Sequence, residues 1–397
     1  MPSRSGPARL LIITDTICDT NGVSRFLRDL AATALERGTQ LHILSASRLC
    51  RGALPGNIRI LTPTLRTPMP WYPEQDLVLL PPFRALAKEI EAIAPDVVHL
   101  STPGPIGLAG RRIARRMGLP LFGTYHTDFP AYLYANTGRP CIQRLAEGAL
   151  RRFYRDFQGI FIRSEAYRPR LIESMGFPHD RIHPLPPGID LNRFAPRFRD
   201  SGIWRRYGLE KEGFKALYVG RTTREKNLPF LLESWKILHR LAPELTLVII
   251  GTGEFYKHAE SYRKYGIRFL GEIKGEALSR LYASSDLFLF PSLTDTLGQV
   301  VMEAMASGLP VIVADKGGPA TLLDRENPGG WILPADDPRR YAQWILNIAR
   351  NPALRKQYAD NALQSARDFD FSHTFDAFWG THFPTPDSQI PKGGPQP

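Results

Sequence analysis

The chain has 397 residues, of which 43% are hydrophobic and 23% are charged. That length is too great for one ordinary hydrophobic core and predicts two globular domains. No apolar run approaches the roughly 18 residues that a membrane-spanning helix needs. The first residues also lack the apolar core of a secretory signal. We therefore expect neither an integral membrane protein nor a secreted one.

The net charge is +12, and the excess of cations lies in residues 1–200, which hold 27 Lys and Arg against 17 Asp and Glu. A solvated surface is one explanation. Attraction to anionic lipid headgroups or to an acidic acceptor is the alternative. Nucleic acid is disfavoured, because no interleaved aromatic or helix-turn-helix pattern accompanies the arginines. They include Arg111, Arg112, Arg115 and Arg116 on an expected helix, then Arg139, Arg144, Arg151, Arg152 and Arg155.

The three cysteines are scattered, odd in number and without the spacing of a metal site. We therefore expect Cys18, Cys50 and Cys141 to be reduced thiols of a cytoplasmic protein.

In the first half of the chain, short apolar runs alternate with longer amphipathic stretches. This alternation predicts a parallel sheet with helices on both faces, in a domain spanning residues 1–190. Strands are expected at Leu10–Asp15, Leu41–Ser47, Asp96–Thr102, Leu119–His126 and Gly159–Ser164, and helices at Val23–Arg37 and Ile106–Met117.

Two segments of this half carry candidate site residues. Gly22 opens the first expected helix and would let a phosphate or sugar approach the backbone. An ordinary strand–helix turn is the simpler alternative, because no G-x-G-x-x-G follows the first strand. Tyr125-His126 ends another expected strand, where His126 could hydrogen-bond a sugar hydroxyl. Asp128 could orient His126, or meet an acceptor hydroxyl together with Tyr125; a histidine with satisfied hydrogen bonds is the alternative.

A Pro- and Gly-rich boundary separates the two halves, with a linker expected at 187–212. The strand–helix alternation then restarts, which predicts a second doubly wound domain over 213–364 with ligands bound between the domains. Strands are expected at Phe214–Gly220, Leu245–Gly251, Ile267–Gly271, Asp286–Pro291, Pro310–Ala314 and Trp331–Leu333, and helices at 228–241, 275–284, 297–307 and 337–350.

Two cations flank the first turn of the second domain. Arg221 follows an apolar strand, and Lys226 stands just before the next helix. Because a helix N-terminus adds positive potential, this turn is well placed to bind a diphosphate. A surface turn with ordinary charges is the alternative, and the Gly251-Thr-Gly253 segment is only a weak echo of a nucleotide-binding turn.

The Asp295–Glu303 segment holds two carboxylates eight positions apart. Thr296 and Gln299 could form a capping box, with Asp295 as an anion at the helix start. That alternative does not explain Glu303, which stands among apolar residues and needs a partner: a cation, or, as the rest of the sequence favours, sugar or ribose hydroxyls. No His or Cys accompanies the two acids, so we expect no metal site.

The end of the chain is expected to divide in two. A helix near 365–383 could pack back on the first domain, and the proline-rich residues 384–397 are expected to be disordered.

In combination, these motifs resemble the retaining glycosyltransferases of family 4, whose GT-B fold consists of two facing Rossmann-like domains with a cleft between them. The resemblance runs from Leu11 to about Phe378. Its strongest match is the acid-x7-acid signature from Asp295 to Glu303, where the family commonly has Glu as the first acid. The Gly-Arg-x4-Lys-Asn motif at 220–227, Gly22-Val23, Tyr-His-Thr and the hinge Pro-Gly-Ile-Asp also match.

The resemblance implies a role for each of these residues. Arg221 and Lys226 would hold the donor diphosphate and stabilise it as it leaves, and Glu303 would bind the ribose hydroxyls. The first acid would contact sugar hydroxyls. In full, the implied catalytic residues are Arg221, Lys226, His126 and Asp295, and the implied donor site is Gly22, Arg221, Lys226, Asp295, Thr296, Leu297, Gly298 and Glu303.

The implied reaction transfers a hexose, with retention, from a UDP- or GDP-sugar to a hydroxyl, without a metal or cofactor. The acceptor could be a lipid or a lipid-linked glycan at the inner face of the cell membrane. A nucleotide-sugar epimerase or hydrolase of the same fold and a non-catalytic nucleotide-sugar-binding subunit are the alternatives.

Overall fold

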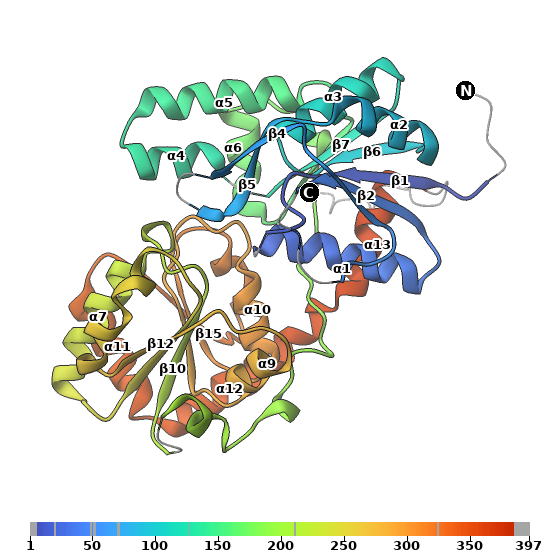
Figure 1. Cartoon of the computed structure of the whole chain (residues 1–397). Helices are drawn as coiled ribbons and strands as arrows, with labels where there is room; N and C mark the ends of the chain where they lie inside the picture. The colour runs from blue at the N-terminus through green and yellow to red at the C-terminus, as the bar shows by residue number, and fades with distance from the viewer. Residues whose placement is uncertain are drawn as a thin grey trace, which may run out of the picture.

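The computed structural model describes residues 6–384, except 20, 48–49, 51–52, 70–71, 127, 210–211 and 324. Figure 1 shows two α/β domains, one above the other, joined by extended segments. The expected disorder of 384–397 falls almost wholly outside the described residues. In the part of the chain that is described, no helix is both long and apolar enough to cross a membrane.

The first domain is built on a parallel sheet of seven strands in the order β3-β2-β1-β6-β7-β8-β9. Its central strands are short apolar runs buried on both faces, as parallel sheets require. The strands are β1 (Arg9–Ile13), β2 (Gln40–Ala46), β3 (Ile58–Leu61), β6 (Val97–Leu100), β7 (Leu121–Tyr125), β8 (Gly159–Ile162) and β9 (Ile182–Pro184), and the helices are α1 (Gly22–Glu36), α2 (Phe83–Ile93), α3 (Pro105–Arg116), α4 (Phe129–Thr137), α5 (Pro140–Tyr154) and α6 (Arg168–Glu173).

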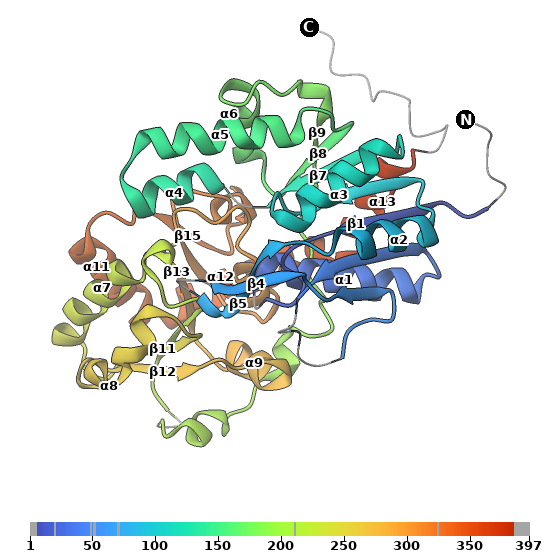
Figure 2. The same cartoon turned by 45° about the horizontal axis from the view of Figure 1, so that its top comes forward.

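A separate antiparallel ribbon interrupts this pattern between β3 and α2. It consists of β4 (Leu65–Met69) and β5 (Tyr72–Leu80), and in Figures 1 and 2 it extends from the first domain toward the second.

The second domain repeats the design with six parallel strands in the order β12-β11-β10-β13-β14-β15. The expectation of two doubly wound α/β domains is therefore confirmed. The strands are β10 (Lys215–Val219), β11 (Thr246–Ile250), β12 (Ile267–Gly271), β13 (Leu287–Phe290), β14 (Val311–Ala314) and β15 (Gly330–Leu333), and the helices are α7 (Leu228–Leu241), α8 (Ala259–Tyr262), α9 (Gly275–Ala283), α10 (Gln299–Ala306), α11 (Pro338–Ala349), α12 (Pro352–Ala366) and α13 (Phe371–His382).

Helix α13 belongs to the second half of the chain but packs on the first domain, beside α1 (Figure 1). Phe371, Phe375 and Phe378 enter a core cluster with residues of α1, β1 and β2. Two buried histidines also join this helix to the sheet: His99 Nδ1 lies 3.0 Å from His382 Nε2. Because His382 Nδ1 donates to the Phe378 carbonyl, its Nε2 must accept from His99 if both rings are neutral.

We predict that this histidine contact makes the fold labile to acid. Burial lowers the pKa of His382 to about 3 and that of His99 well below its usual value, so both rings are neutral in the fold. The unfolded chain binds more protons below pH ~6.5, so stability falls by up to about 1.4 kcal/mol per pH unit for each ring. Urea unfolding at pH 7 and pH 5 measures the loss. The exposed His373, changed to Gln, is the control, and equal stability at the two pH values would contradict the prediction.

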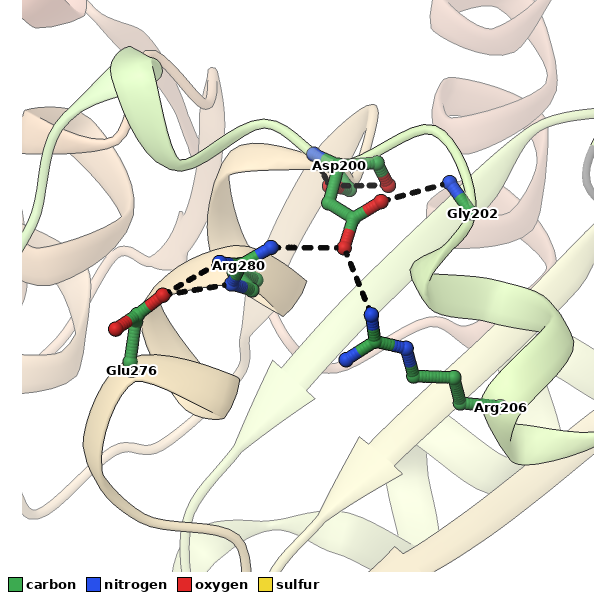
Figure 3. Close-up of polar contacts among 6 residues, drawn as sticks. Asp200, Gly202, Arg206, Glu276 and Arg280 are labelled. Atoms are coloured by element: carbon green, nitrogen blue, oxygen red, sulfur yellow. Dashed lines mark hydrogen bonds and ion pairs between the residues drawn. The ribbon is translucent and has the colours of Figure 1, made fainter.

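The segment between the domains is fixed to α9 by one aspartate (Figure 3). Asp200 accepts from the Gly202 amide at 2.9 Å and from Arg280 Nη1 at 3.0 Å. Its backbone amide donates to the Ser284 hydroxyl at 2.9 Å. The Gly202 amide first, and then Arg280, hold the pKa of this carboxyl below its usual value. Together, these contacts hold the connecting segment against the second domain.

The expectation of three reduced thiols is wrong for two of them. Cys18, after β1, and Cys50, after β2, form a disulfide, whereas Cys141 is free and exposed. Neighbouring strands of one sheet bring the two cysteines together, although 32 positions separate them in the sequence. The argument from thiols to a cytoplasmic location therefore fails.

We expect the Cys18→Ser change to destabilise the chain, because opening a loop of this length adds about 3–4 kcal/mol of conformational entropy to the unfolded state. Urea unfolding of this variant and of the control Cys141→Ser measures the difference. Alkylation of Cys18 and Cys50 in freshly isolated protein, without a reductant, would contradict the disulfide.

Candidate functional site

Each sheet reverses its strand order at one point, and the two reversal points face each other. In the first sheet the reversal lies between β1 and β6, and in the second between β10 and β13. Ligands of doubly wound sheets bind beyond the carboxyl ends of the strands at such points. Gly22 follows β1, Arg221–Lys226 follows β10, and Asp295–Gly298 follows β13.

Direct contacts join these segments across the domain boundary. The Thr296 hydroxyl donates to the His126 carbonyl at 2.5 Å, and the Tyr167 hydroxyl donates to the Asp295 carbonyl at 3.1 Å. A Cβ on Gly22 would lie 3.4 Å from the Gln299 side-chain oxygen, so the starts of α1 and α10 are neighbours. The residues expected from the sequence thus gather at one place, with the positive ends of two helices.

In the loop after β10, both expected cations have carboxylate partners. Lys226 Nζ lies 2.7 Å from Asp295 Oδ1, and Arg221 forms an ion pair with Glu225. Burial alone would raise the pKa of Asp295, but the charge and hydrogen bond of Lys226 hold it below its usual value. A diphosphate carries the same kind of charge as these carboxylates and could replace them as the partner of the two cations.

The glycines around this loop are required for close backbone packing. A Cβ on Gly251 would lie 2.0 Å from the Gly220 carbonyl oxygen, and one on Gly253 would lie 2.9 Å from that of Thr222. The Thr222 amide donates to the Thr252 carbonyl at 2.8 Å. The backbone of the Gly251-Thr-Gly253 segment therefore packs directly against the backbone of Gly220 and Thr222, where the Arg221–Lys226 loop begins.

Helix α10 begins at Gln299 and has no side-chain cap. Its N-cap is Gly298, with φ 80°, and the Thr296 hydroxyl is bonded to His126 instead. The capping-box alternative is therefore wrong. Leu297 is buried in the core of the second domain. An uncapped helix start leaves backbone N–H groups free to bind a phosphate or a sugar oxygen.

Glu303 forms an ion pair with an arginine of the first domain. Its side chain is 3% exposed, and its Oε1 lies 2.6 Å from Arg25 Nη1 of α1. The Tyr282 hydroxyl donates to its other oxygen at 2.9 Å. Burial raises the pKa of Glu303, while the Arg25 charge and the tyrosine oppose that shift. The carboxylate thus lies in the second turn of α10, with a cation of the first domain and a hydroxyl of the second as its partners.

His126 is held by Ser101, and Asp128 does not orient it. The Ser101 hydroxyl lies 3.0 Å from His126 Nε2, and burial lowers the pKa of the ring to about 3, so it is neutral. Asp128 is the N-cap of α4, accepts from the Tyr125 hydroxyl at 2.9 Å, and pairs with Arg170 at 2.6 Å. The Tyr125 and Asp128 side chains are both buried in this network, and the Tyr125 ring lies 6.0 Å from that of Tyr167, whose hydroxyl donates to the Asp295 carbonyl.

Sequence reasoning missed two arginines at this place, Arg25 and Arg163. Arg25 is half-buried and stands one turn after Gly22, so a cation in the first turn of the expected helix was the available signal. Arg163 directly follows the last residue of β8, just as His126 follows the last residue of β7, so both lie at the same edge of the sheet. Among the described residues, no group of three or more His, Cys, Asp or Glu could hold a metal ion.

Solved structures share this architecture. The fold matches Anabaena HepE in complex with UDP and glucose at a TM-score of 0.73, with 16% identity over 95% of this chain and 100% of that one. It matches WaaG, a glycosyltransferase involved in lipopolysaccharide biosynthesis, at 0.72, with 17% identity over 95% and 100%. Two facing Rossmann-like domains define the GT-B class of protein.

The sequence comparisons are more specific. Residues 203–365 match the glycosyl transferases group 1 family, and residues 20–193 match glycosyltransferase family 4. The GDP-mannose-dependent alpha-mannosyltransferase of Mycobacterium tuberculosis is 34% identical over 302 residues, 76% of each chain. Sulfoquinovosyl transferase SQD2 of Arabidopsis thaliana is 32% identical over 308 residues, 77% of this chain and 59% of that protein. The chain belongs to glycosyltransferase family 4.

Proposed function

We propose that this glycosyltransferase moves a hexose from a UDP- or GDP-sugar to a hydroxyl acceptor, with retention of configuration and without a metal or cofactor. The observation that carries the proposal is the meeting of Lys226, Arg221, the uncapped start of α10 and Glu303 at the domain boundary. These groups match the parts of a nucleotide sugar: its diphosphate and its ribose hydroxyls.

The proposed catalysis depends on where negative charge develops during the transfer. As the sugar–phosphate bond breaks, the diphosphate gains negative charge, which Arg221 and Lys226 stabilise more in the transition state than in the ground state. In a front-side displacement, the leaving phosphate oxygen accepts the proton of the acceptor hydroxyl, so no protein base is assigned. The neutral His126 imidazole donates to or accepts from a sugar hydroxyl from the first domain.

A donor screen tests this proposal. GDP-mannose is the first donor to test, because a relative matching 76% of each chain is named for it. Thermal shift across UDP-, GDP- and ADP-sugars should reveal one base by a concentration-dependent rise in the unfolding temperature. Product NMR with that donor should show the anomeric configuration retained. Inverted product, or nucleotide release that no acceptor accelerates, would reject retaining transfer, and the second result would favour the hydrolase alternative.

We also propose that the enzyme contacts anionic membrane surfaces through α5. Arg111 and Arg115 of α3 pair with Asp156, so α3 is the weaker candidate. On α5, Arg144 and Arg152 are exposed beside Leu145, which is 75% exposed. Cations around an exposed apolar side chain favour anionic lipid surfaces.

Vesicle co-sedimentation tests the membrane proposal. Binding should increase with the fraction of anionic lipid, fall with salt, and weaken in the Arg144→Gln/Arg152→Gln variant. The Arg339→Gln/Arg340→Gln change on α11 is the matched control. Equal binding to neutral vesicles would contradict the proposal.

A further inference from the structure

One cation at the domain boundary is buried without an anionic partner. Arg163 follows β8 and is 7% exposed, and its Nη1 atom has no hydrogen-bond partner. No ion pair to a described carboxylate involves it, and burial alone lowers its pKa to about 10. An arginine with this pKa is charged at neutral pH, so the site holds an uncompensated positive charge.

The position of Arg163 links it to the proposed site. Its guanidinium carbon lies 4.2 Å from the centre of the Phe26 ring on α1, and that ring lies 5.7 Å from the His126 ring. The next residue, Ser164, lies 3.3 Å from the Thr321 hydroxyl of the second domain. Arg163 therefore stands where the two domains meet, beside the histidine expected to touch the sugar.

The ring contact accounts for one face of the guanidinium only. A cation over an aromatic face is stabilised, but the N–H groups of Nη1 still need acceptors, and a buried charged donor without one is costly. The planar fork of arginine fits the oxygen pairs of carboxylates, sulfonates and phosphates. A bound oxyanion would thus accept the hydrogen bonds of Arg163 Nη1, for which the described residues provide no acceptor.

We propose that Arg163, backed by the Phe26 ring, binds an anionic group carried by one of the two substrates. The group is either an acid on the transferred sugar or a phosphate on the acceptor. This inference rests on the proposed transferase function and adds a charge requirement to it. The donor diphosphate is assigned to Arg221 and Lys226 of the second domain, so Arg163 serves a different anion.

A calorimetric experiment with two arms distinguishes an acid on the transferred sugar from a phosphate on the acceptor. The donor arm compares UDP-glucuronate with UDP-glucose, and GDP-mannuronate with GDP-mannose. The acceptor arm compares D-inositol 3-phosphate with inositol, each titrated into enzyme saturated with UDP or GDP. We expect the wild-type enzyme to bind the anionic member of one arm about 10–100-fold more tightly than its neutral counterpart.

Arg163→Gln should abolish that preference while leaving the affinity for the neutral member unchanged. Arg163→Lys, which keeps the charge but not the planar guanidinium, should retain part of the preference for the anionic ligand. Arg112→Gln, on the exposed side of α3, is the matched control and should behave as wild type. The preference of the wild-type enzyme is measured independently of whether any variant folds.

Absence of a preference in both arms, with nucleotide sugars still bound, would overturn this inference alone. It would also be overturned if Arg163→Gln weakened binding of UDP, GDP and neutral sugar nucleotides equally, because Arg163 would then serve the diphosphate. If the wild-type enzyme bound no UDP or GDP compound at all, the proposed transferase function would fail, and this inference with it.

Discussion

Lys226→Ala is expected to lower kcat about 10²–10³-fold, because it removes one fixed positive charge from the leaving diphosphate. The loss should appear in the chemical step, since the charge matters most when the bond breaks. Steady-state kinetics with the donor identified by the screen measure it. Arg224→Ala is a closely matched control: it lies two positions earlier in the same turn, but its side chain is 72% exposed and pairs with Glu254.

The Lys226 variant also leaves Asp295 without its partner, so loss of folding must be separated from loss of catalysis. The Lys226→Gln/Asp295→Asn double variant removes both charges of the 2.7 Å pair and should unfold near the wild-type temperature. It should be as inactive as Lys226→Ala. Wild-type turnover in either variant would reject the assigned role.

Glu303→Gln is expected to weaken nucleotide binding by about 10–100-fold, because a hydrogen bond to a charged acceptor contributes about 1.5–3 kcal/mol. The loss of affinity should depend on whether the nucleotide carries the ribose 2′-hydroxyl. If Glu303 binds the ribose, removing the 2′-hydroxyl of the nucleotide and changing Glu303 should cost little more together than either change alone. Calorimetry with UDP or GDP and the 2′-deoxy analogue measures this coupling.

Glu254→Gln, on an exposed side chain of the same domain, is the control for the Glu303 experiment. Additive losses from the two changes would show that Glu303 acts elsewhere. Arg25 Nη1 lies 2.6 Å from a carboxylate oxygen of Glu303. Ribose binding therefore requires this contact between the domains to rearrange, and the measured affinity includes that cost.

The sequence was sufficient to predict most regular elements near the site. The expected helix at 228–241 is α7; the expected 275–284 is one residue longer than α9 at its C-terminal end, and 337–350 is one residue longer than α11 at each end. Apolar runs bounded by glycine and proline mark such elements locally. Gly22, Arg221, Asp295 and Glu303 could be named as candidate site residues because motif spacing depends only on the strand–turn–helix order.

What could not be predicted depends on contacts between distant segments. The Arg25–Glu303 pair joins residues 278 positions apart, and the Cys18–Cys50 bond depends on which strands are neighbours. The β4–β5 ribbon was missed because it interrupts the strand–helix alternation from which the fold was inferred. Arg163 was not singled out from the sequence, since burial at the end of a strand depends on the helices packed over it.

The central claim is that Lys226 and Arg221 hold the diphosphate while Glu303 holds the ribose at the domain boundary. A crystal structure with bound UDP or GDP tests it most directly. We predict diphosphate oxygens within hydrogen-bond distance of Lys226 Nζ, and ribose hydroxyls on the Glu303 carboxylate in place of Arg25. A nucleotide bound elsewhere, with the Lys226–Asp295 and Arg25–Glu303 pairs intact, would contradict it.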